Sequence, residues 1–162
     1  MDRPNAGRAI GAGFVATLVM TILMYGGPIV GMPKMDIAAM LGSMLGQAMA
    51  APGSGTWWIG MIMHFVNGTI IFPLIYAYAL YAVLPGAPWV KGTTWGFVLW
   101  VIAQAIVMPV MGMGFFSSGA PQPIMAVAGS FIGHLIYGGI LGGVTGRAAG
   151  DAQAVSRERR AA

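Results

Sequence analysis

The only two histidines of the chain, His64 and His134, lie inside long apolar segments and are its best candidates for chemistry. An ionisable side chain is costly inside a membrane, so it is by default a functional candidate. In one interpretation both imidazoles are axial ligands of a haem, or two ligands of copper or another metal ion. In the alternative, each is a neutral hydrogen-bond partner in a polar seam with Asn67 and Tyr137. Two histidines alone make an incomplete copper or zinc site.

Methionines could complete such a site, because thioether sulfur is a ligand that suits Cu(I). Three of them, Met108, Met111 and Met113, occur in the segment VMPVMGMGFF, and Met20 and Met24 lie in the first apolar segment. Methionine is also a common filler of irregular cores. The pattern therefore predicts either a soft metal site or ordinary methionine packing.

Three polar residues accompany these candidates. Asp36 precedes a stretch with helical spacing, where its carboxylate would accept hydrogen bonds from the first backbone N–H groups. The alternative role for Asp36 is a carboxylate at the outward mouth of a site, where it attracts cations. Gln104 and Asn67 lie within apolar segments, where polar groups more often join helices than bind substrates.

Signatures of catalysis and of nucleic-acid binding are absent from the sequence. No apolar segment holds a paired carboxylate, and no Gly-rich phosphate loop is followed by lysine. Zero cysteines exclude thiolate metal sites and cysteine nucleophiles. The basic residues sit at the chain ends and, as Lys34 and Lys91, in the connections between spans rather than in a stripe. We therefore expect a protein that is not an enzyme and has no nucleic-acid partner.

The elements that must position these residues are four helices in a lipid bilayer. The chain is 57% hydrophobic and only 7% charged, too few charges to coat a water-soluble surface. Four segments without Asp, Glu, Lys or Arg are long enough to cross the hydrocarbon core, namely 9–30, 58–83, 92–113 and 124–146. The prediction is an all-α, four-helix transmembrane bundle forming one domain over 1–146.

The connections carry their own signals. Apolar residues recur at helical spacing from Met35 to Leu45, which predicts a short helix between the first two spans, at the interface or in the bundle mouth. Pro73 and Pro109 should kink the second and third spans and free carbonyl groups that neighbours must satisfy. Residues 147–162 form a polar cytoplasmic tail that we expect to be disordered.

Orientation follows from the basic residues beside the spans, because cytoplasmic flanks retain them. One side of the membrane holds Lys34 alone. The other holds Arg3, Arg8, Lys91, Arg147, Arg157, Arg159 and Arg160. With an even number of spans, this bias predicts a multi-pass cell-membrane protein with both termini in the cytoplasm.

An internal two-helix repeat is visible when the halves are aligned. The second span reads MHFVNGTIIF and the fourth GHLIYGGILG, which pairs His64 with His134 and Gly68 with Gly138. GFVATLVM in the first span resembles GFVLWVIA in the third. Equivalent positions of a parallel repeat face one another across the bundle, so the two histidines are expected to meet near its centre.

The segments MDIAAMLGSMLG, MHFVNG, MPVMGMGFF and GSFIGHLIYGGILG carry a family resemblance. Up to about Gly146 the chain resembles a family of small prokaryotic membrane proteins of unknown function, sometimes encoded near respiratory oxidases. The resemblance implies a four-span bundle connected with the respiratory chain, and it transfers no catalytic residue. Its recurring elements here are Asp36, His64, Met108, Met111 and His134.

Three functions remain open from the sequence. The leading hypothesis is a non-catalytic accessory or assembly subunit of a membrane complex, such as a respiratory one, because small size and Gly-rich helix faces suit packing against other membrane subunits. The second is a haem or copper binding or transfer protein that uses His64 and His134. The third is a small transporter or channel built as an oligomer, because four spans enclose little room for a substrate path.

Overall fold

The computed structural model describes residues 5–46 and 49–161, with side chains to Gly146. Four helical stretches are long and apolar enough to cross a membrane: Ala6–Val30, Gly55–Leu80, Pro88–Val110 and Pro123–Gly146. They confirm the predicted all-α transmembrane bundle. All four spans begin one to four residues before the predicted starts. Ser54 caps the second span, and Pro88 occupies the first turn of the third.

The second and third spans are composite helices. Each contains a π-helical segment that ends just before a proline: η3 precedes Pro73, and η5 precedes Pro109. These are the helix irregularities predicted from the two prolines. The second span comprises α3 (Gly55–Val66), η3 (Asn67–Ile71), α4 (Phe72–Ile75) and η4 (Tyr76–Leu80), and the third comprises α5 (Pro88–Ile102), η5 (Ala103–Val107) and α6 (Met108–Val110).

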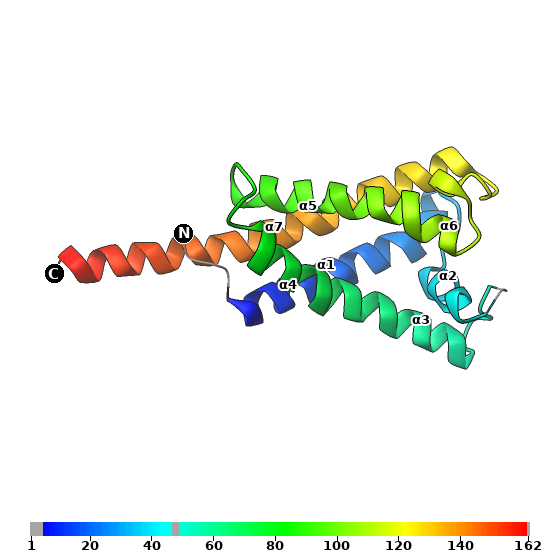
Figure 1. Cartoon of the computed structure of the whole chain (residues 1–162), viewed down its shortest axis with the longest axis horizontal. Helices are drawn as coiled ribbons and strands as arrows, with labels where there is room; N and C mark the ends of the chain where they lie inside the picture. Colours follow the sequence, from blue (N-terminus) through cyan, green and yellow to red (C-terminus); the bar gives the residue numbers. More distant parts are fainter. Residues whose placement is uncertain (1–4, 47–48, 162) are drawn as a thin grey trace.

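The first and fourth spans, α1 (Ala6–Gly26) and α7 (Pro123–Ala161), pack against each other, and the second and third spans pack on them. One face of α7 carries α5, and α1 packs on α7 and also on η3 and α4 (Figure 1). Glycines bring the α5 and α7 backbones together: a Cβ added at Gly138 would overlap the Gly92 carbonyl, and one at Gly96 would overlap the His134 carbonyl. This close approach fixes the height of His134 relative to α5.

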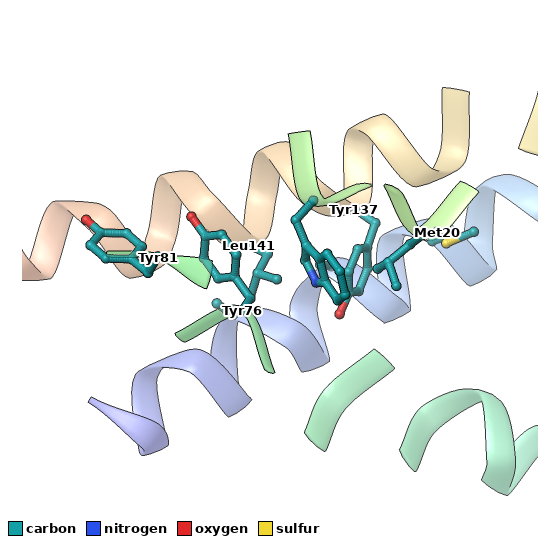
Figure 2. Close-up of a cluster of buried hydrophobic side chains, with 9 residues drawn as sticks. Met20, Tyr76, Tyr81, Tyr137 and Leu141 are labelled. Atoms are coloured by element: carbon teal, nitrogen blue, oxygen red, sulfur yellow. The ribbon is translucent and has the colours of Figure 1, made fainter. Parts of the chain in front are cut away.

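One half of the bundle, toward the chain termini, is filled by a hydrophobic core. Figure 2 shows Tyr81, Tyr76 and Leu141 following one another along this core, with Tyr137 and Met20 toward its other end. Lys91, which the sequence analysis placed as a flank of the third span, lies inside α5 and is buried. Its ammonium donates to the Tyr81 carbonyl at 2.7 Å and stands 4.6 Å from the Tyr81 ring centroid. That bond ties the start of α5 to the end of the second span.

At the opposite end, α3 and α6 diverge, and α2 (Ile37–Gly42) fills the space between them (Figure 1). The short 3-10 turns η1 (Gly27–Val30), η2 (Ser43–Leu45) and η6 (Phe115–Ser117) lie in the adjoining connections. The helix predicted between the first two spans is thus tucked into the bundle mouth. We refer to this end as the α2 end.

Asp36 anchors α2, as the N-cap prediction required. Its carboxylate accepts from the Ala39 amide at 3.0 Å, from Trp57 Nε1 at 3.0 Å and from the Tyr25 hydroxyl at 2.6 Å. Burial alone would raise the pKa of the Asp36 carboxyl. The three hydrogen bonds and the charge of Lys34 outweigh burial, so its pKa lies below the ordinary value.

The C-terminal tail differs from expectation. The sequence analysis predicted disorder for residues 147–162, but α7 continues without interruption to Ala161 and projects beyond the bundle (Figure 1). The reason lies in residue type, since Ala, Arg, Gln and Glu all have high helix propensity and follow directly on a formed helix. Residue 162 lies outside the described part.

The glycine contact between α5 and α7 makes a direct prediction. Gly138→Ala should destabilise the protein by about 1–3 kcal/mol, because the added methyl group meets the Gly92 carbonyl and forces the helices apart. Gly143→Ala, one turn and a half further along the same helix, meets open space and should leave stability unchanged or raised. Thermal unfolding in detergent measures both, and equal effects of the two changes would contradict the contact.

The Asp36 anchor predicts a pH dependence. Because its folded-state pKa is depressed, its contribution to stability is present above the ordinary Asp pKa of about 3.9 and disappears as the pH falls through the lower folded value. At about pH 7, Asp36→Asn should therefore unfold at a lower temperature than wild type, and the gap should narrow toward about pH 2. A gap that stays constant over this range would show that the charge of Asp36 is not what holds α2.

Candidate functional site

A cavity of about 150 Å³ lies within the bundle on the α2 side of the hydrophobic core. All four spans and α2 contribute to its wall. His64 from α3 and His134 from α7 both line it, as do Asn67 and Tyr137. The structure thus brings together the two histidines that the sequence analysis singled out.

The hydrogen bonds around His64 select one tautomer. Its Nε2 lies 2.9 Å from the Thr21 hydroxyl oxygen, and that hydroxyl donates to the Thr17 carbonyl at 2.7 Å. A hydroxyl carries one proton, so both bonds form when His64 Nε2–H donates to Thr21. The proton then resides on Nε2, and the lone pair of His64 Nδ1 is left available.

The surroundings of His134 select the opposite tautomer. Its Nδ1 lies 2.8 Å from the Ser130 carbonyl oxygen, one turn earlier in α7. A carbonyl can only accept, so Nδ1 carries the proton and the lone pair lies on Nε2. Among the described residues, neither His64 Nδ1 nor His134 Nε2 has a hydrogen-bond partner.

This arrangement is typical of metal-binding imidazoles. A ligating histidine almost always donates its other ring N–H to a carbonyl, carboxylate or water, which fixes the tautomer and orients the ring. His134 does so to a backbone carbonyl and His64 to a hydroxyl that is itself tied to the backbone. The cavity can therefore offer two neutral nitrogen lone pairs from two different spans.

Methionine side chains line the same cavity as the two histidines. Met20, Met24, Met108 and Met111, all proposed from sequence, line the cavity, and so does Met35. Met20 approaches the fourth span at Gly133, the residue before His134: its methyl carbon would be 3.5 Å from a Cβ built on Gly133. Across the described residues, no group of three or more His, Cys, Asp or Glu side chains is placed to hold a metal ion. Any further ligand from the wall must be a thioether or a neutral polar group.

Met113 and Gln104 lie elsewhere. Met113 does not line the cavity but packs against the neighbouring cluster that contains Met108 and Met111. Gln104 is fully buried and its carbonyl oxygen accepts from the Ser117 hydroxyl at 2.8 Å, so it joins the third span to the following loop. Asp36 anchors α2 and is likewise not part of the wall.

Three residues of this site were not identified as part of it from the sequence. Thr21 fixes His64 from another span, and a contact between residues so distant in sequence leaves no local pattern. The i, i+4 spacing of Ser130 and His134 on one helix was a usable signal for the second tautomer. Met35 was counted only in the apolar stripe of the predicted short helix, yet it lines the cavity.

The size of the cavity distinguishes between the two cofactors considered. Pockets for drug-sized ligands begin at roughly 300 Å³, and haem is at the large end of that class. A cavity of about 150 Å³ can hold a metal ion among side-chain ligands but has no room for a macrocycle between the histidines. The haem alternative is therefore disfavoured by the space available.

Comparison with known proteins identifies a family whose function is unknown. Neither the curated proteins nor the solved structures contain a match to this chain. A family model described as a family of unknown function (DUF6789) matches residues 4–156, which include all four spans and α2. The chain is accordingly a member of this family, DUF6789.

Proposed function

We propose that this protein binds Cu(I) in the cavity between its four spans and does not act as an enzyme. The observation that carries the proposal is the pair of free lone pairs, on His64 Nδ1 and His134 Nε2, in a cavity whose other walls are rich in thioethers. Imidazole nitrogen and thioether sulfur together suit Cu(I). Met20, which lines the cavity and approaches the fourth span at Gly133, is the candidate for the third ligand.

The donor set favours copper over other biological metals. Structural zinc takes four ligands from Cys, His, Asp and Glu, and only two histidines of that set line this cavity. Calcium and magnesium require oxygen ligands, with carboxylates foremost. The cavity wall contains no carboxylate. Neutral ligands also suit a monovalent ion in a low-dielectric site, because only one positive charge must be accommodated there.

The proposal also includes the orientation of the protein in the membrane and its internal two-helix repeat. The excess of Lys and Arg beside the terminal end supports a cytoplasmic location for both termini, with α2 and the cavity toward the outward side. A two-helix repeat would account for one histidine at the same depth in the second and fourth spans. The site would then hold Cu(I) close to the outer surface of the membrane.

The two other functions fare differently. A role as an accessory or assembly subunit of a membrane complex, including a respiratory one, is compatible with copper binding, and the helical tail projecting from the bundle supports it as a place of attachment (Figure 1). Transport through a single copy has less support. The aromatic core around Tyr76, Tyr81 and Leu141 fills the bundle on the terminal side of the cavity (Figure 2).

Metal analysis of the purified protein tests the copper site. Wild type loaded with Cu(I) in mild detergent should show both nitrogen and sulfur ligands by X-ray absorption. His64→Leu and His134→Leu should each lower the bound Cu(I) by one ion per chain and remove the nitrogen ligands. Asn67→Leu, a change in the same wall, is the control and should retain the ion. Wild type that holds no Cu(I), or His variants that hold as much as wild type, would overturn the proposal.

Thr21 should tune the same site without touching the metal. Thr21→Val preserves shape but removes the hydroxyl that accepts from His64, so Cu(I) affinity should fall by about 10–100-fold. Thr94→Val is a matched control, because the Thr94 hydroxyl is exposed and bonds only to the Val90 carbonyl of its own helix. Competition with a chromophoric Cu(I) chelator measures both, and unchanged affinity in Thr21→Val would exclude tautomer selection by Thr21.

A further inference from the structure

A second group of methionines lies at the α2 end, next to the cavity. Met40 from α2 packs with Met108 and Met111 of the third span, and Met63 and Met113 pack against them. We call these five residues the methionine cluster. Met40, Met108 and Met111 are at least nine-tenths buried even without surrounding lipid.

The fold brings these side chains together from three separate segments. Gly42 and Gly60 let α2 lie directly on α3, because a Cβ on Gly60 would overlap the Ala38 carbonyl. The Asp36 hydrogen bonds hold the start of α2 in that position, and Met40 and Met63 then reach the same cluster.

The third segment reaches the cluster by a tight turn after α6. The Met113 amide donates to the Met108 carbonyl at 2.9 Å, and the Gly119 amide donates to the Met113 carbonyl at 2.8 Å. Gly112 and Gly114 both adopt positive φ, which allows the chain to turn back at this point. Met113 is thereby directed to the cluster rather than to the cavity.

We propose that the methionine cluster is a second Cu(I) site, with thioether ligands only, adjoining the histidine site. Sulfur atoms of Met40, Met63 and Met113 would supply the ligands. This inference rests on the proposed function for the choice of metal, but the two sites use different residues. Met108 and Met111 belong to both the cluster and the cavity wall, which makes the two sites neighbours.

The chemistry requires no change of oxidation state. Thioether is a neutral, soft donor that releases no proton on binding, so Cu(I) enters and leaves as Cu(I). At the α2 end, the cluster adjoins the cavity, because Met108 and Met111 belong to both. The geometry therefore points to a soft-metal site from which Cu(I) passes to the histidine site.

Silver titration separates the two sites. Ag(I) is a stable stand-in for Cu(I), and calorimetry in a chloride-free detergent buffer counts the ions bound per chain. Wild type should bind two. The triple variant Met40→Leu, Met63→Leu and Met113→Leu should lose one ion and keep the nitrogen ligands seen by X-ray absorption with Cu(I). The double variant His64→Leu and His134→Leu should lose the other and retain sulfur ligands only.

Each outcome bears on one site or the other. A single ion in wild type that vanishes in the histidine variant, with the triple variant unaffected, would overturn the methionine site and leave the proposed function intact. A single ion that survives in the histidine variant and is lost from the triple variant would establish the cluster and overturn the histidine site. No bound Ag(I) would overturn both. Each Met→Leu change conserves volume and lowers the stability by less than about 1.5 kcal/mol. Thermal unfolding verifies that the triple variant is folded.

Discussion

The hydrogen bond from the Tyr137 hydroxyl to the Gly68 carbonyl, 2.7 Å long and buried, is the contact on which the cavity depends. In η3 the backbone bonds run five residues back, as from the Phe72 amide to the Asn67 carbonyl. The next amide in that register would belong to Pro73, which has none, so the Gly68 carbonyl is left without a partner from its own helix. A bare carbonyl is expensive in a bilayer, and Tyr137 satisfies it from the fourth span.

That bond also sets the relation between the two histidines. Tyr137 lies three residues after His134, and Gly68 lies four residues after His64, so the bond joins the histidine-bearing helices one turn away from the imidazoles. Thr17 completes the junction, because it packs against Gly68 from the first span. Three spans are thereby fixed at one level. Beyond it, toward α2, the second and third spans separate and leave the space that the cavity and α2 occupy.

The sequence predicted much of this because the strongest signals are local. The span lengths, the cap at Asp36 and the two proline irregularities all follow from residues close together in the chain. The meeting of His64 and His134 was predicted by aligning the two halves of the sequence, which relates residues far apart in the chain. The partners that fix the tautomers were not predicted in full, since Thr21 approaches His64 from another span. Met113 was grouped with Met108 and Met111 as a possible ligand, but it does not line the cavity and follows a turn in which Gly112 and Gly114 have positive φ.

The tail was mispredicted for a related reason. Its polarity indicated disorder when it was considered alone, but it continues a helix that is already nucleated, so each added residue costs far less than a new helix would.

The continuity of α7 has a mechanical consequence. A helix of 39 residues is about 58 Å long at 1.5 Å per residue, and the part after Gly146 accounts for about 22 Å of it. The π segments interrupt the second and third spans, whereas α7 runs as one α-helix from Pro123 to Ala161. The tail and His134 are therefore parts of one continuous helix, which the glycines of α5 approach closely. A force applied to the tail would therefore act on the same uninterrupted helix that carries His134 into the cavity wall.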